Sequence, residues 1–540
     1  MFFDRSVFLN VFPENYHTDI YDIANIFYKG AILRGPRICD VNPDATGANA
    51  GAGADYVAVS LFDKRWYIDV YFCVRGGRPD DGNNLIAEDE NYPCARQNHI
   101  KAEAVFIDGY SKAYSIKLTL YRILKKRAFS ERKRERPLPW GALVGVRPVK
   151  IYSDLLDRGA TIPEIAGEMS RAYDVPAKTS ELCLRIATAQ KPILRAYDPD
   201  KDCMLYIGIP FCVSKCAYCS FPSDAHNKID IYAPRYVDAL LKELNYIAGY
   251  IRDAGRGVKA VYIGGGTPTA LGARELDKLL GGVGEAFFDS CADEITVEAG
   301  RADTIDRDKL AIIRKAAKIA DRLRLCVNPQ TMNARTLSLI GRNHTPVDVL
   351  KAYWLAREEG FNEINMDIIA GLPGEDISDF NRTLDAISQL KPESLTSHTL
   401  CVKRSSRLYE RGNDYEYPGA ETAEAMQEAA YDLSIQMGMA PYYLYRQKNT
   451  IGGLANVGYA VKGRECIYNI HEMADRLDVF AAGAGAVSKF INAAAGSVER
   501  VFNVKNLLEY ISRNDEMIER KKRYLTSKRK ESSVNGKRIE

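Results

Sequence analysis

From Met204 onward the sequence repeats one pattern, and this repeat restricts the possible folds more than any other feature. Short apolar runs of strand length alternate with amphipathic segments of helix length. Such alternation predicts βα units and a parallel sheet, with functional groups at the carboxyl ends of the strands. The six strand-like runs lie at residues 205–209, 260–263, 294–298, 323–327, 363–369 and 394–400. Because a closed barrel needs eight units, we predict an α/β fold with an open, partial (β/α)6 barrel over residues 200–400.

The rest of the chain divides into three regions. Residues 1–195 mix strand-like runs with helical periodicity and contain two loop signals rich in small residues, which predicts an α+β N-terminal domain whose role the sequence does not indicate. Residues 401–515 combine a helical segment at 423–436 with glycine-rich loops, which predicts a C-terminal α/β extension. Residues 516–540 are rich in Lys and Arg and predict a frayed helix that leads into a disordered tail.

Composition excludes several classes of protein. The 74 Lys and Arg residues almost balance the 71 Asp and Glu residues, and a net charge of +3 argues against a dedicated nucleic-acid binder. The N-terminus lacks the basic and apolar regions of a secretory signal, and no apolar run of about 20 residues could span a membrane. We therefore expect a cytoplasmic protein with reduced cysteines.

The loop after the first predicted strand carries three cysteines, Cys212, Cys216 and Cys219, with C-x3-C-x2-C spacing. Three thiolates from one short loop can ligate three irons of a [4Fe–4S] cluster and leave the fourth iron open to a small molecule. A zinc site is the main alternative, but zinc favours four Cys or His ligands, and no fourth one lies at matching spacing. The spacing therefore favours the cluster.

Three motifs resemble the radical S-adenosylmethionine (SAM) superfamily. They are Y-I-x-I-P-F-C at residues 206–212, G-G-G-T-P-T at 264–269 and D-x-I-x-G-L-P-G at 367–374. Together they are similar to the oxygen-independent coproporphyrinogen III oxidases, also called coproporphyrinogen dehydrogenases. The long N-terminal extension and Y-L-Y-R-Q-K at 443–448 are similar to the HemZ group of that family.

The resemblance implies a [4Fe–4S] cluster and SAM as cofactors. The glycines of the second motif would let backbone approach the aminoacyl group of SAM, because glycine has no Cβ. Two tyrosines that flank the cysteines are candidates to pack on the cluster or the adenine, although such tyrosines are also common in cores. The predicted SAM contacts are Tyr206, Tyr218, Gly265, Gly266, Thr267, Glu298, Gln330, Arg342 and Asp367.

The resemblance also implies an activity. The SAM-derived radical would drive oxidative decarboxylation of two propionates of coproporphyrinogen III to vinyl groups, which gives protoporphyrinogen IX in haem biosynthesis. A reductant such as flavodoxin or ferredoxin would supply electrons. A substrate with four carboxylates calls for Arg or Lys, and Arg446 and Lys448 are our candidates, although an ordinary exposed basic turn explains them almost as well. We predict no catalytic side chain beyond the cluster ligands.

Two positions depart from the pattern of this family. Phe221 stands where the better-understood members have a fourth cysteine, and Gly208 stands where they have His. Haem chaperones of the HemW type also have Phe at the position of Phe221. The alternative is therefore a haem-binding chaperone that retains a cluster and SAM site. Those chaperones carry H-N-x-x-Y-W, which this sequence lacks, so the dehydrogenase is favoured. A radical SAM enzyme that modifies RNA, with the basic run at 125–136 as its contact, is disfavoured by the near-neutral charge.

Overall fold

The computed structural model of the chain forms two compact units, residues 1–145 with 159–181 and residues 146–158 with 182–540. The residues that the structure describes are 7–11, 32–33, 55–62, 65–71, 99–103, 112–130, 138–221, 229–287, 292–492 and 496–536. The two N-terminal loop signals rich in small residues and the last four residues of the chain lie outside these described ranges.

The smaller unit is an α+β assembly, as the sequence predicted. Its five-stranded sheet has the order β2-β1-β3-β4-β5, with parallel pairs around β1 and antiparallel pairs from β3 to β5. A capping box between Thr161 and Glu164 begins α4. The bounds are Val7–Val11 (β1), Ile32–Leu33 (β2), Asp55–Phe62 (β3), Arg65–Tyr71 (β4), His99–Glu103 (β5), Lys112–Ser130 (α2) and Ile162–Tyr173 (α4).

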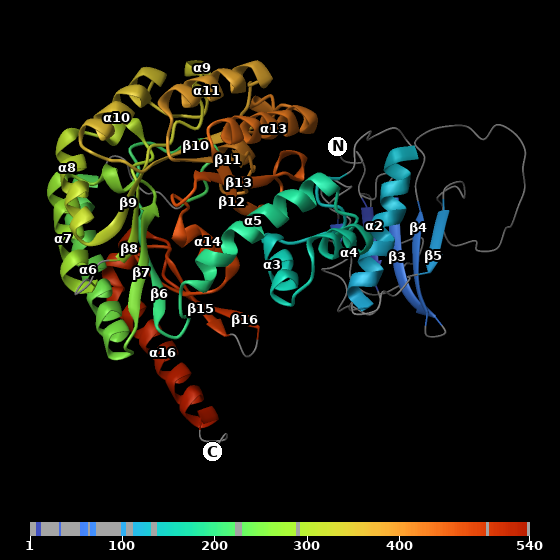
Figure 1. Cartoon of the computed structure of the whole chain (residues 1–540), viewed down its shortest axis with the longest axis horizontal. Helices are drawn as coiled ribbons and strands as arrows, with labels where there is room; N and C mark the ends of the chain where they lie inside the picture. Colours follow the sequence, from blue (N-terminus) through green and yellow to red (C-terminus); the bar gives the residue numbers. More distant parts are fainter. Residues whose placement is uncertain are drawn as a thin grey trace, which may run out of the picture. The chain divides into compact units, whose positions relative to one another are not determined.

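The larger unit is built on six parallel strands, which confirms the predicted partial barrel (Figure 1). Each strand pairs with the next one in the chain, from β6 through β11. The strands are mostly buried because helices cover one side of the sheet and other elements cover the opposite side. Their bounds are Asp202–Ile209 (β6), Gly257–Gly265 (β7), Ala292–Glu298 (β8), Ala320–Cys326 (β9), Ile364–Ala370 (β10) and Ser394–Thr399 (β11).

The helices of the βα units lie along the outside of this sheet (Figure 1). In α7, Leu276, Leu279, Leu280 and Val283 are buried, and this spacing of three or four residues places them on one helical face. Among the described residues, no helix combines the length and apolar character needed to cross a membrane. The bounds are Ile229–Asp253 (α6), Ala273–Phe287 (α7), Arg307–Lys315 (α8), Ala334–Leu339 (α9), Pro346–Glu358 (α10) and Ile377–Leu390 (α11).

The C-terminal region extends the same sheet at both edges. Two strands follow β11 in the sheet order and three follow β6, which makes eleven strands. Helix α14 contacts both β7 and β12, which lie far apart in that order, so the sheet curves around it. The bounds are Ala420–Gln436 (α13), Met439–Arg446 (β12), Ala455–Val461 (β13), Ile467–Ala474 (α14), Asp478–Ala482 (β14), Val487–Asn492 (β15) and Ser497–Phe502 (β16).

The division into units differs from the domain boundary expected near residue 195. Helix α3 (Val149–Asp157) and most of α5 (Ala177–Arg195) belong to the larger unit. The reason is direct bonding to the sheet, since the Gln190 side-chain amide donates to the Tyr442 carbonyl at 2.9 Å.

The expectation of a disordered tail is wrong as far as Gly536, because residues Asn514–Gly536 form helix α16. Met517, Lys521 and Leu525 recur every four residues and are buried. The Lys521 ammonium lies 2.6 Å from Glu243 of α6, and both side chains are almost fully excluded from solvent. This buried ion pair holds the basic helix on the barrel.

Replacing Lys521 should therefore destabilise the protein strongly. Lys521→Met keeps the bulk of the side chain but leaves the Glu243 carboxylate without its cation, which costs about 3 kcal/mol. Arg523→Met is the matched control, because Arg523 is 79% exposed and pairs with Glu519 of the same helix; its loss should cost less than about 1 kcal/mol. Urea unfolding measures both, and equal midpoints for the two variants would contradict this packing.

Candidate cluster and SAM site

The cysteine loop leaves β6 after Ile209 and is fixed by backbone and side-chain hydrogen bonds. The Ala217 amide donates to the Ile340 carbonyl at 2.8 Å, and the Ser214 hydroxyl donates to the Gly341 carbonyl at 2.9 Å. On its other side the Ala217 carbonyl accepts from the Leu408 amide at 3.0 Å. The loop is therefore held by segments that follow α9 and β11.

The glycine motif at the end of β7 anchors the start of this loop. The Gly266 amide donates to the Ile209 carbonyl at 2.6 Å, and the Thr267 amide donates to the Phe211 carbonyl at 2.7 Å. A Cβ at Gly266 would lie 2.9 Å from the Ile209 oxygen and closer still to the Phe211 oxygen, and Gly265 has φ +105°. These glycines are thus required for the approach of two backbones, and two amide donors that we expected to face SAM are already used.

The three cysteines are free thiols within this loop. The Thr267 hydroxyl lies 3.3 Å from the Cys212 sulfur, and the buried Arg301 guanidinium donates to the Cys216 sulfur at 3.6 Å. Burial raises the pKa of Cys212 to about 11. In the described part of the chain, no three His, Cys, Asp or Glu side chains converge as ligands of a single ion would. A cubane carries its irons at separate corners, so thiols that stand apart in one loop fit a cluster better than zinc.

Two half-buried carboxylates lie on strands of the barrel, Glu298 at the end of β8 and Asp367 midway along β10. Glu298 accepts hydrogen bonds from the Tyr262 hydroxyl and, at 2.9 Å, from the Asn328 amide. Burial, reinforced by the neighbouring Asp367, raises the pKa of Glu298 to about 7. Burial would also raise the pKa of Asp367, but hydrogen bonds from His398 and Asn365 hold it below its ordinary value. The site therefore pairs one carboxyl that titrates near neutrality with one that stays ionised.

Gln330 lies beside Asp367. Its backbone amide donates to the Asp367 carbonyl at 2.9 Å, and its φ of +66° is a left-handed conformation that costs about 1 kcal/mol. Within the described residues, the side-chain oxygens of Gln330 and Asn328 are buried and have no hydrogen-bond partner. Buried acceptors of this kind are costly unless a donor reaches them, so they fit the hydroxyl and amine groups of SAM.

Arg342 joins the cysteine loop to the strand ends. Its buried guanidinium donates to the Tyr218 hydroxyl at 3.0 Å and to the Asn328 carbonyl at 2.9 Å, and it also contacts the Gly300 carbonyl. Tyr206 lies deeper, with its ring 6.4 Å from that of Tyr262. The structure thus gives Arg342 and Tyr218 a positioning role next to the cysteines, while Tyr206 belongs to an aromatic group under Glu298.

The structure does not bring Arg446 to this site. Tyr443 and Tyr445 stack on one face of β12, and Tyr445 contacts His398, so the next residue points to the opposite face. There Arg446 is half-buried near Cys183 of α5, and burial lowers its pKa to about 10. Lys448 is exposed, and its carbonyl accepts from the Cys401 thiol at 3.0 Å, which places its backbone near the end of β11.

Five residues of this site were not predicted from the sequence, although most of them occupy similar positions in the barrel. They lie at or just beyond the carboxyl ends of the barrel strands, or face the same side as Glu298 and Asp367. Alternation, carried across the paired strands from those two carboxylates, would have selected Tyr262 and His398. The missed residues are Tyr262, Arg301, Asn328, His398 and Tyr445.

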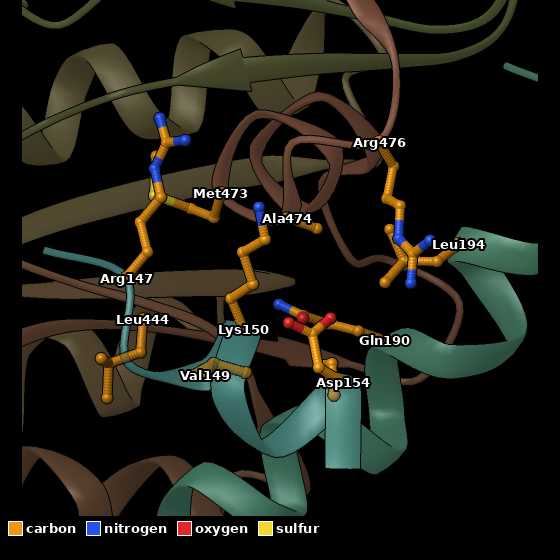
Figure 2. Close-up of a pocket in the computed structure, with 11 residues that line it drawn as sticks. Arg147, Val149, Lys150, Asp154, Gln190, Leu194, Leu444, Met473, Ala474 and Arg476 are labelled. Atoms are coloured by element: carbon orange, nitrogen blue, oxygen red, sulfur yellow. The ribbon is translucent and has the colours of Figure 1, made fainter. Parts of the chain in front are cut away.

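A cavity elsewhere in the larger unit is not this site (Figure 2). Its lining comes from α3, α5, β12 and the segment that ends α14, and it includes none of the predicted cofactor residues. Arg147 there pairs with Asp475, and Arg476 pairs with Asp157 at 2.9 Å. The charges around this cavity are therefore largely satisfied by one another.

Comparison with known proteins decides the family. Residues 206–387 match the radical SAM superfamily. The chain is also 38% identical over 388 residues to the oxygen-independent coproporphyrinogen-III oxidase-like protein HemZ of Bacillus subtilis, which covers 72% of this chain and 77% of that protein. The chain belongs to this HemZ-like family of radical SAM proteins. Radical SAM proteins use a [4Fe–4S] cluster and SAM, and the thiols and buried acceptors described above fit both groups.

Other relatives of this radical SAM protein cover less of it. The haem chaperone HemW of Escherichia coli is 34% identical over 200 residues, which is 37% of this chain and 50% of HemW. HemW of Mycobacterium tuberculosis is 32% identical over 214 residues. The chain spans about half the length of these chaperones. The solved structure of coproporphyrinogen III oxidase HemN from Escherichia coli is 23% identical, with a TM-score of 0.47, and covers 62% of this chain and 73% of HemN.

Cys216→Ala should abolish cluster binding, because the variant keeps only two of the three thiolates that hold the cubane. Iron and acid-labile sulfide per chain after anaerobic reconstitution measure the effect. Cys183→Ala is the control, because Cys183 is a buried thiol of α5 outside the loop and should leave the iron content unchanged. Equal iron in Cys216→Ala and wild type would contradict the assignment.

SAM binding should strengthen as the pH rises through about 7, the pKa of Glu298. The ionised carboxylate attracts the positively charged SAM and the protonated one does not, so we expect about a tenfold change. By linkage, the SAM-free protein should lose stability as the pH rises from 4.5 toward 7, because the folded state binds the additional proton there.

The Glu298→Gln variant should show neither pH dependence. The SAM dissociation constant and the unfolding midpoint, each measured across this pH range, provide the test. A pH dependence of SAM affinity that persists in Glu298→Gln would assign the titration to another group.

Proposed function

We propose that this protein is an oxygen-independent coproporphyrinogen III dehydrogenase. The observation that carries the proposal is the 38% identity to a coproporphyrinogen-III oxidase-like protein over 388 residues, which is 72% of the chain and 77% of that protein. The cysteine loop with its cationic and hydroxyl donors supports it, because the reaction needs a radical initiator.

The residues of the site divide the work of holding the two cofactors. When bound, the cluster and SAM supply a 5′-deoxyadenosyl radical. Cys212, Cys216 and Cys219 would ligate three irons, with Arg301 donating to Cys216 and so stabilising its thiolate. The remaining SAM contacts would come from residues that we predicted from the sequence: Gly265, Gly266, Thr267, Glu298, Gln330, Arg342 and Asp367.

The tyrosines beneath the carboxylates would keep the reaction away from water. Tyr206, Tyr262 and Tyr468 form one aromatic group, with ring centroids 4.9 to 6.4 Å apart. Burial raises the pKa of each hydroxyl far above its ordinary range, so all three remain neutral. A neutral, enclosed wall protects a reactive radical from side reactions.

In the proposed reaction each of two propionates loses one hydrogen atom from its β-carbon to the radical. The carbon–carbon bond to the carboxylate then breaks, and carbon dioxide and one electron leave as the vinyl group forms. A one-electron acceptor of the iron–sulfur or flavin class would take that electron, and a flavodoxin or ferredoxin would reduce the cluster. The product is protoporphyrinogen IX. A cytoplasmic location remains a prediction.

A haem-binding chaperone is the second candidate. Two HemW proteins are 32% and 34% identical to this chain over 214 and 200 residues. Phe221 also stands at the position of the fourth cysteine that the coproporphyrinogen enzymes carry. Such a protein would keep the cluster and SAM site but bind haem without converting a porphyrinogen.

Anaerobic turnover separates the two candidates. The reconstituted protein is mixed with coproporphyrinogen III, SAM and a strong reductant, and protoporphyrin and 5′-deoxyadenosine are followed together. We expect both products in wild type and neither in Cys216→Ala. If 5′-deoxyadenosine forms while the porphyrinogen is unchanged, the dehydrogenase proposal fails, and stoichiometric haem binding would then support the chaperone.

A further inference from the structure

Four positively charged side chains lie in or next to the cysteine loop, and we refer to them as the basic rim. They are Lys215, Lys403, Arg404 and Arg407. Lys215 lies within the loop itself, between Cys212 and Cys216. The other three follow β11, whose carboxyl end lies at the same edge of the sheet as the end of β6 because the strands are parallel.

Packing brings the segment after β11 against the cysteine loop. Leu400 and Leu408 belong to one apolar cluster with Ala217, and Tyr218 packs against that cluster. The Leu408 amide also donates to the Ala217 carbonyl at 3.0 Å. Residues 403–407 lie between these two leucines and are therefore held next to the cysteines.

Electrostatics agree with this placement. Lys403 and Lys215 both lie close enough to the Cys219 sulfur to interact with it electrostatically. The two lysines thus reach the third cysteine from different segments of the chain.

The basic rim lacks counter-charges. Within the described residues, none of its four side chains makes an ion pair or a side-chain hydrogen bond, although Glu410 and Asp414 follow in the same segment. Arg307, which is also exposed, instead pairs with Glu358 at 2.9 Å. Arg404 and Arg407 are exposed, while Lys215 and Lys403 are half-buried. Like charges gathered without anions repel one another and create a local field that attracts a polyanion.

We propose that the basic rim binds the carboxylates of a polycarboxylate tetrapyrrole at the entrance to the cluster site. This inference rests on the proposed function, because it assigns the substrate-binding role that we first gave to Arg446 and Lys448. Arginine offers a planar fork that matches a carboxylate in two hydrogen bonds, and lysine adds a flexible point charge. A substrate with carboxylates at its periphery would use both.

The test is the double variant Arg404→Gln/Arg407→Gln in the full-length reconstituted protein, because both arginines are exposed and neither is among the groups that act on the cysteines. We expect KM for coproporphyrinogen III to rise about tenfold, since each charged hydrogen bond lost at a partly exposed site weakens binding several-fold, with kcat within about twofold of wild type. The slow SAM cleavage without porphyrinogen should stay unchanged, which shows that the cluster and SAM sites are intact. Added salt should raise KM in wild type more than in the variant.

Two further variants control for indirect effects. Lys462→Gln removes an exposed lysine just after β13, at the edge of the sheet where β11 begins, and should leave KM unchanged. Arg404→Lys keeps the charge and should retain most of the affinity that Arg404→Gln loses. An unchanged KM in the double variant, or an equal rise in Lys462→Gln, would overturn the inference.

The outcome stays separable from that of the proposed function. If wild type converts no coproporphyrinogen, the dehydrogenase proposal fails, and the basic rim is then judged by fluorescence titration with coproporphyrin III, which carries four carboxylates. Weaker binding by the double variant than by wild type would support the rim. Equal binding would overturn it.

Discussion

Two backbone hydrogen bonds determine most of the geometry of this site, those from the amides of Gly266 and Thr267 to the carbonyls of Ile209 and Phe211. They require the end of β7 to touch the start of the cysteine loop, and side chains at residues 265 and 266 would prevent that contact. Once the contact is made, the Thr267 hydroxyl reaches Cys212 and the loop can extend across the strand ends. The cluster motif and the glycine motif are therefore parts of one structural unit.

A second set of bonds connects that unit to the half-buried carboxylates. Arg342 contacts Tyr218 of the loop and the Asn328 carbonyl, and the Asn328 side chain donates to Glu298. Glu298 in turn interacts with Asp367. A continuous path of contacts thus runs from the cysteines to the group that titrates near pH 7, which would let the protonation state of Glu298 influence how SAM is held.

The fold and the cluster ligands could be predicted from the sequence because their signals are local. Apolar runs gave the six strands, and the cysteine spacing lies within eight residues. Long-range partners could not be predicted in this way. Lys521 is buried because it pairs with Glu243, and this partner lies 278 positions away in the chain. From the sequence, the positive charge of Lys521 suggested only a solvated tail. Arg446 points away from the site because its neighbour Tyr445 contacts His398 of β11, a long-range contact that the sequence does not mark.

We infer that the chain holds a [4Fe–4S] cluster through Cys212, Cys216 and Cys219 and leaves one iron open to SAM. The EPR spectrum of the reduced, reconstituted protein, recorded with and without SAM, tests it most directly. We expect a cluster signal whose g values change when SAM is added. A signal that saturating SAM leaves unchanged, or a protein that binds zinc and no iron–sulfur cluster, would contradict it.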